Sequence, residues 1–133
     1  MNQTPAPVLA NVFVALFAAF FVFYGLGFAF FPQALFLQLT DFALEAGSQT
    51  IDIRATYGGL SVAFGIVMLK VWRMPGGLKL ALSFIIVSML AMATGRLIGM
   101  LIDGDSNLMM KLYLSLEIGS ALVAFGFLRS LKI

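Results

Sequence analysis

Three charged side chains lie within, or at the edge of, long apolar runs of the chain: Arg54, Arg96 and Glu117. A charge inside a membrane helix costs a few kcal/mol, so such side chains usually face other helices and pair. Arg96 precedes Asp103 by seven residues, which places it about 10 Å from the end of its run at 1.5 Å per residue. Glu117 follows Leu108 by nine residues and lies at a similar depth in the next run. This matching depth predicts an ion pair between Arg96 and Glu117.

Helical spacing adds polar neighbours to each of these charges. Side chains three, four or seven positions apart share one face of a helix. If the three faces converge, they form a polar pocket in the outer half of the membrane. The candidate ligand-binding residues of this pocket are Arg54, Tyr57, Arg96, Asp103, Tyr113 and Glu117.

These residues support three interpretations. The first is a structural lock, in which a buried Arg96–Glu117 pair fixes the register of two helices and Arg54 extends toward the interface. The second is ligand binding, because the planar guanidinium suits a carboxylate or a phosphate, such as that of a lipid headgroup. The third is catalysis, with Glu117 as the acid or base and a tyrosine as its partner.

The composition limits the chemistry and indicates where the chain resides. Of 133 residues, 62% are hydrophobic and 11% are charged, whereas soluble domains are nearer half apolar and a quarter charged. This composition predicts an integral membrane protein. The absence of Cys and His excludes disulfides, thiolate or imidazole catalysis, and metal sites built from these ligands. We expect no catalytic residue, cofactor or metal and, at a net charge of +2, no nucleic-acid partner.

Four apolar runs must position these residues, and each has roughly the 20 residues that a membrane-spanning helix needs. The predicted helices cover residues 8–31, 53–69, 80–102 and 108–128. In residues 33–46, apolar side chains recur at helical spacing with polar ones on another face, which predicts a short helix in the outer interface. The predicted fold is an all-α integral membrane protein, a bundle of four transmembrane helices that forms a single domain over residues 1–133.

The charged residues outside the runs predict the orientation of the chain. Basic residues flank the second loop and follow the last helix, while acidic residues gather in the other two loops. The positive-inside rule then places both termini in the cytoplasm. The basic set is Lys70, Arg73, Lys79, Arg129 and Lys132, and the acidic set is Asp41, Glu45, Asp52, Asp103 and Asp105.

Small residues recur four positions apart on the last three runs. This spacing puts them on one face of each helix, where neighbouring backbones can approach closely. The pair Gly95 and Gly99 forms a GxxxG motif, which indicates helix packing. The predicted packing glycines are Gly58, Gly59, Gly95, Gly99 and Gly119.

Two segments carry a family resemblance: residues 52–59, with the sequence DIRATYGG, and residues 94–99, with the sequence TGRLIG. The second segment is followed by Asp103 and Gly104 and later by Glu117. Together they resemble an uncharacterised group of small bacterial four-helix membrane proteins that are usually placed with the DoxX-like proteins. The resemblance implies a four-helix bundle in the bacterial inner membrane, and it carries no established catalytic residues.

The function that we expect first is non-enzymatic. The protein would bind a lipid-like or other amphipathic molecule, or a partner subunit, through the region of Arg54, Arg96 and Glu117. The alternatives are a membrane-embedded enzyme that acts on an apolar substrate with Glu117 as proton carrier, and a purely structural subunit of a larger membrane complex. The expected partners are the lipid bilayer, a lipid-like ligand, and a second copy of the chain or another membrane protein.

Overall fold

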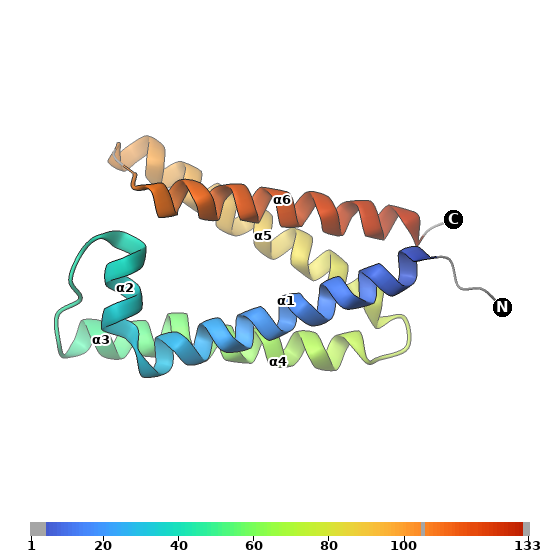
Figure 1. The fold of residues 1–133 in the computed structure, drawn as a ribbon, viewed down its shortest axis with the longest axis horizontal. Helices are drawn as coiled ribbons and strands as arrows, with labels where there is room; N and C mark the ends of the chain where they lie inside the picture. The colour runs from blue at the N-terminus through green and yellow to red at the C-terminus, as the bar shows by residue number, and fades with distance from the viewer. Residues whose placement is uncertain (1–4, 105, 132–133) are drawn as a thin grey trace. The chain divides into compact units, whose positions relative to one another are not determined.

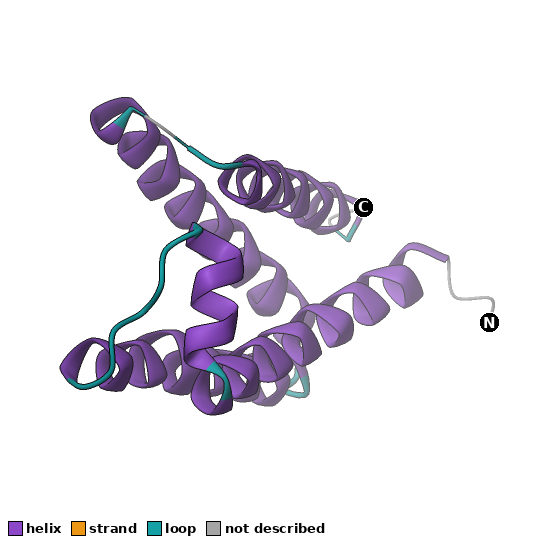
Figure 2. Ribbon diagram, turned by 60° about the vertical axis from the view of Figure 1, so that its left-hand side comes forward, coloured by secondary structure: helices purple, strands orange, loops and turns teal. Residues whose placement is uncertain are grey.

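The computed structural model describes residues 5–104 and 106–131, and all regular structure in this part of the chain is helical (Figure 1, Figure 2). Asp105 and Lys132, which contributed to the predicted orientation, lie outside the described residues. The helices are α1 (Pro5–Phe30), α2 (Pro32–Thr40), α3 (Ser48–Ile53), the π-helix η1 (Arg54–Gly59), α4 (Leu60–Trp72), α5 (Gly77–Asp103) and α6 (Leu108–Ser130).

Four helical stretches are long and apolar enough to cross a membrane: Pro7–Phe30, Ser48–Trp72, Gly77–Asp103 and Leu108–Ser130. The predicted fold class, all-helical with four membrane-length helices, is therefore confirmed. The second stretch begins at Ser48 and not at Ile53, because α3, η1 and α4 follow one another without a break. The third begins at Gly77 and not at Leu80.

The second membrane-length stretch contains a π-helical turn that the sequence analysis did not predict. Over Arg54–Gly59 the backbone is wider than an α-helix, and the N–H of Leu60 bonds to the carbonyl of Ala55 five residues earlier. The Thr56 hydroxyl also donates to the carbonyl of Asp52 at 2.7 Å, a contact that often bends helices. Side chains before and after this turn therefore do not follow the 3.6-residue spacing that the sequence analysis assumed.

The helix predicted over residues 33–46 is shorter in the structure, since α2 ends at Thr40. Asp41 adopts a left-handed conformation with φ of 63° and caps the helix, its N–H bonding to the Leu37 carbonyl. The Thr40 hydroxyl then accepts a hydrogen bond from the Phe42 N–H at 3.2 Å, which turns the chain away. Residues 41–46 are not helical, and Leu44 is buried among them.

The chain divides into two compact units, which are described separately. The hairpin unit contains residues 5–14, 71–104 and 106–131, and the aromatic unit contains residues 15–70. In the hairpin unit α5 packs against α6, to which it is joined by a short loop (Figure 1). Near the other end of this helix pair, the rings of Phe13 and Phe127 lie 5.7 Å apart, and the Trp72 indole donates to the Asn11 side chain at 2.7 Å.

In the aromatic unit, the main part of α1 lies beside η1 and α4, and glycines allow the helices to approach (Figure 1). A Cβ placed on Gly25 would come within 2.6 Å of the Gly58 carbonyl oxygen and of the Val62 nitrogen. A Cβ on Gly65 would come within 2.7 Å of the Ala18 carbonyl oxygen. Backbone therefore packs against backbone along this interface, as is common between membrane helices.

Candidate functional site

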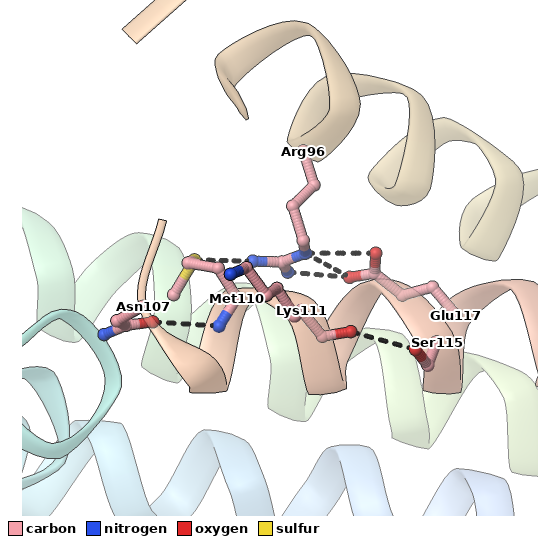
Figure 3. Close-up of polar contacts among 6 residues, drawn as sticks. All are labelled: Arg96, Asn107, Met110, Lys111, Ser115 and Glu117. Carbon is pink, nitrogen blue, oxygen red and sulfur yellow. Dashed lines mark hydrogen bonds and ion pairs between the residues drawn. The ribbon is translucent and has the colours of Figure 1, made fainter. Parts of the chain in front are cut away.

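The predicted ion pair between Arg96 and Glu117 is confirmed and joins α5 to α6 (Figure 3). Arg96 Nη2 lies 2.7 Å from Glu117 Oε1, and Arg96 Nε lies 3.2 Å from Oε1 and 3.1 Å from Oε2. Two guanidinium nitrogens thus donate hydrogen bonds to both carboxylate oxygens. Such bidentate pairs are among the strongest contacts between an arginine and a carboxylate. The Glu117 side chain is 4% exposed and that of Arg96 is 19% exposed.

Two further α6 side chains surround the Arg96 guanidinium. Its Nη1 donates a hydrogen bond to the Met110 sulfur at 3.0 Å, and its Cζ lies 5.3 Å from the centre of the Tyr113 ring, a cation–π distance. Met110, Tyr113 and Glu117 are spaced by three and four residues, so one face of α6 holds the guanidinium. The Asn107 side chain accepts from the Met110 N–H at 2.9 Å and so fixes the first turn of this face (Figure 3).

This arrangement suits a structural lock better than a proton-transfer site. The carboxylate and the guanidinium compensate each other's charge in a largely buried position. Across residues 5–104 and 106–131, every buried side-chain nitrogen or oxygen has a hydrogen-bond partner. A fully satisfied polar contact between two helices fixes their register, and removing one member leaves a costly buried charge.

The remaining candidate residues divide between the two units. Asp103 lies exposed at the end of α5 in the hairpin unit, and no ion pair to it occurs within the described part of the chain. Arg54 and Tyr57 belong to η1 in the aromatic unit. A pocket that combines Arg54 and Tyr57 with the residues around Arg96 therefore stays a prediction.

In the aromatic unit, the exposed Arg54 side chain caps the end of α1. Its Nη1 donates to the Ala29 carbonyl oxygen, which lies in the last turn of α1, where carbonyls lack helical donors. A cation at this end also complements the helix dipole. The ring of Tyr57 lies 5.3 Å from that of Phe28, and Tyr57 is 41% exposed. Arg54 and Tyr57 thus extend from one turn beside the end of α1.

The predicted packing glycines differ in what surrounds them. A Cβ on Gly58 would lie 2.9 Å from the Ala29 nitrogen, so Gly58 packs closely against α1. A Cβ on Gly59 or Gly99 would have no neighbour nearer than 3.9 Å or 3.6 Å, respectively. A Cβ on Gly95 or Gly119 would meet no atom within 4 Å beyond its own stretch of helical backbone. At these last four glycines, an added Cβ would meet no atom of a neighbouring helix within 4 Å in the described part of the chain. Their role in helix packing stays a prediction.

A family model described as Domain of unknown function (DUF4345) matches residues 9–128. The chain belongs to this family. The match takes in Arg54, Arg96 and Glu117 and most of each membrane-length stretch of this DUF4345 protein. No match was found among curated proteins or among solved structures.

Two contacts of this DUF4345 chain were not predicted from the sequence, that of Met110 with Arg96 and that of Arg54 with the Ala29 carbonyl. Met110 precedes Tyr113 by three residues and Glu117 by seven, so the spacing that selected Tyr113 could also have selected Met110. No sequence signal indicates that Arg54 would reach the Ala29 carbonyl, because that contact depends on how α1 packs against η1. Among the described residues, no group of three or more His, Cys, Asp or Glu is placed to hold a metal ion.

Proposed function

We propose that this DUF4345 protein is a non-enzymatic multi-pass membrane protein that binds an anionic, lipid-like molecule at Arg54. The observation that carries the proposal is that Arg54 is exposed and that most of its hydrogen-bond donors have no partner within the described residues. In this part of the chain its guanidinium has one hydrogen-bond partner, the Ala29 carbonyl, and no acidic partner. A guanidinium carries five N–H donors, so most of its donors remain available to a ligand.

The chemistry of this position favours a phosphate or carboxylate attached to an apolar tail. An arginine fork binds such groups through paired hydrogen bonds. Arg54 follows α3 directly, at the polar end of an apolar stretch, where a lipid headgroup lies when its chains enter the bilayer. The exposed Tyr57 beside it adds an aromatic ring with a polar tip, a side-chain type that favours this depth.

A second candidate function, a structural subunit of a larger complex, is favoured by the Arg96–Glu117 pair. That pair is satisfied within the chain and makes α5 and α6 a fixed unit. The catalytic alternative would require Glu117 to exchange a proton while both of its oxygens are held by Arg96. The structure therefore supports binding or assembly over catalysis.

Replacing Arg54 is expected to weaken the retention of anionic lipid. Wild-type protein and Arg54→Gln, both purified in detergent, would be titrated with phosphatidylglycerol or with phosphatidylcholine. Native mass spectrometry would measure the apparent Kd of each protein for each lipid. Losing hydrogen bonds to a charged group should raise the apparent Kd of Arg54→Gln for phosphatidylglycerol about tenfold. The binding of phosphatidylcholine should change less, because its headgroup has no net charge.

Lys111→Gln is the matched control, because Lys111 is also an exposed cation near one end of a membrane-length helix. It should leave phosphatidylglycerol binding close to that of the wild type. Equal losses in Arg54→Gln and Lys111→Gln would show general charge attraction, and no loss in either would contradict the proposal. Unchanged lipid binding together with a co-purifying membrane partner would favour the structural subunit.

We further propose that the protein lies in the bacterial inner membrane with both termini in the cytoplasm, and that the DUF4345 chain is related to the DoxX-like proteins. The orientation is supported by the basic residues around residues 70–79 and by Arg129 after the last apolar run. The relationship is supported by the segments around Arg54 and Arg96, on which the resemblance rests.

Cysteine labelling would test this orientation, because the natural chain contains no cysteine. Ala43→Cys and Met74→Cys each place one thiol at an exposed loop position, after α2 and after α4 respectively. In spheroplasts, a membrane-impermeant maleimide is expected to label Ala43→Cys, whereas Met74→Cys should react only after lysis. The reverse pattern would place the termini outside, and labelling of both before lysis would contradict a fixed orientation.

A further inference from the structure

The Met110 sulfur is held in an uncommon position for a methionine. Arg96 Nη1 donates to this sulfur at 3.0 Å, although a thioether is only a weak acceptor. The donor is itself fixed, because Nε and Nη2 of the same guanidinium are bound to Glu117. The Asn107 cap holds the Met110 backbone at 2.9 Å, so both sides of the contact are positioned (Figure 3).

Met110 has a partly exposed side chain, near one end of a membrane-length stretch. It is the third residue of α6 and therefore lies at the end of a membrane-length stretch, near the loop. Its side chain is half-buried, whereas Met68 and Met89 are buried. A peroxide in the aqueous phase can approach the first turn of α6 without crossing the apolar centre of the helix.

A thioether sulfur carries two lone pairs, and oxidation at one or the other gives two different sulfoxide epimers. At Met110 the guanidinium lies against one side of the sulfur and engages the lone pair there, so oxidation is favoured at the other lone pair. We infer that Met110 is an oxidation site at which peroxides form predominantly one sulfoxide epimer, with Arg96 deciding which. This site is independent of the lipid site proposed at Arg54.

The reaction is a two-electron oxidation by a peroxide. The open sulfur lone pair attacks one peroxide oxygen, the S–O bond forms and the O–O bond breaks. The sulfur is oxidised and the peroxide is reduced. With hydrogen peroxide, the leaving hydroxide takes the proton of the transferred oxygen and departs as water, which leaves the neutral sulfoxide. The partner that reverses this step is a methionine sulfoxide reductase specific for one epimer.

The experiment oxidises folded wild-type protein with hydrogen peroxide, digests it, and treats the peptides with each of the two epimer-specific reductases. Fragment ions that separate Met109 from Met110 report each residue. One reductase should remove most of the Met110 sulfoxide, at an epimer ratio of about ten to one, since a charged donor covers the other lone pair. Met109, half-buried in the same turn, is the matched control and should show a weaker preference.

Two further samples connect the preference to Arg96. Protein unfolded in denaturant before oxidation should give nearly equal epimers at Met110, and this comparison requires no variant. Folded Arg96→Gln should also lose the preference at Met110. Equal epimers in the folded wild type, or a preference that persists in the unfolded chain or in Arg96→Gln, would overturn the inference.

Discussion

Glu117→Gln is expected to lower the free energy of unfolding by roughly 3–5 kcal/mol, the usual cost of removing one member of a buried ion pair. The substitution preserves the shape of the side chain and removes its charge. The guanidinium of Arg96, whose side chain is 19% exposed, would then keep its positive charge beside a neutral amide. Thermal unfolding or SDS-induced unfolding of the protein in a mild detergent would measure the loss.

Two controls separate the ion pair from other effects. Lys111→Gln removes an exposed charge from the same helix and should change stability by no more than about 0.5 kcal/mol. The double variant Arg96→Met/Glu117→Leu replaces both charges by apolar groups and should recover most of the lost stability. If Glu117→Gln is as stable as Lys111→Gln, the pair does not lock α5 to α6. If the double variant is less stable than Glu117→Gln, the loss does not come from the orphaned Arg96 charge.

The sequence allowed the Arg96–Glu117 pair to be predicted because the inference needed little tertiary information. Long apolar runs identify membrane-length helices, and a short loop makes the third and fourth runs neighbours. The depth of each charge then follows from the rise per residue. Each buried charge needs a partner of opposite sign at the same depth. The Arg96–Glu117 pair therefore followed from the hydropathy of the runs and from the number of residues between each charge and the end of its helix.

The surroundings of Arg54 could not be predicted in the same way. The prediction assumed 3.6 residues per turn, whereas Arg54–Gly59 is a π-helix, which changes the faces that its side chains share. The partner of Arg54 is a backbone carbonyl, that of Ala29, and any residue type could supply it. Helix α2 ends at Thr40 because the next residue, Asp41, adopts a left-handed backbone conformation. Aspartate adopts this conformation only occasionally, so its presence in the sequence did not predict the end of the helix.

The glycines show most directly that sequence periodicity does not identify the contacts between helices. Spacing by four selected Gly59 and did not select Gly25, since periodicity shows which residues share a face but not which face meets another helix. In the structure a Cβ on Gly25 would collide with backbone atoms of Gly58 and Val62, while one on Gly59 would meet nothing nearer than 3.9 Å. The two positions therefore give opposite expectations for the same substitution.

Gly25→Ala is expected to lower the free energy of unfolding of the aromatic unit by about 1–3 kcal/mol or more. This range is typical of overpacking in a closely packed core. The added methyl group would lie 2.6 Å from the Gly58 oxygen and 2.6 Å from the Val62 nitrogen. Backbone atoms cannot rotate away as the end of a side chain can, so α1 and the second membrane-length stretch would have to separate. Unfolding of the variant in detergent, monitored by circular dichroism, would measure the loss.

Gly59→Ala is the matched control, because it adds the same methyl group in the same unit where space is available. Alanine favours a helix by up to about 1 kcal/mol over glycine, so this variant should be as stable as the wild type or slightly more stable. Opposite signs at Gly25 and Gly59 would show that close backbone contact, and not helix propensity, decides these positions. Equal effects of the two substitutions would contradict the packing of α1 against η1 and α4, and with it the position of Ala29 beneath Arg54.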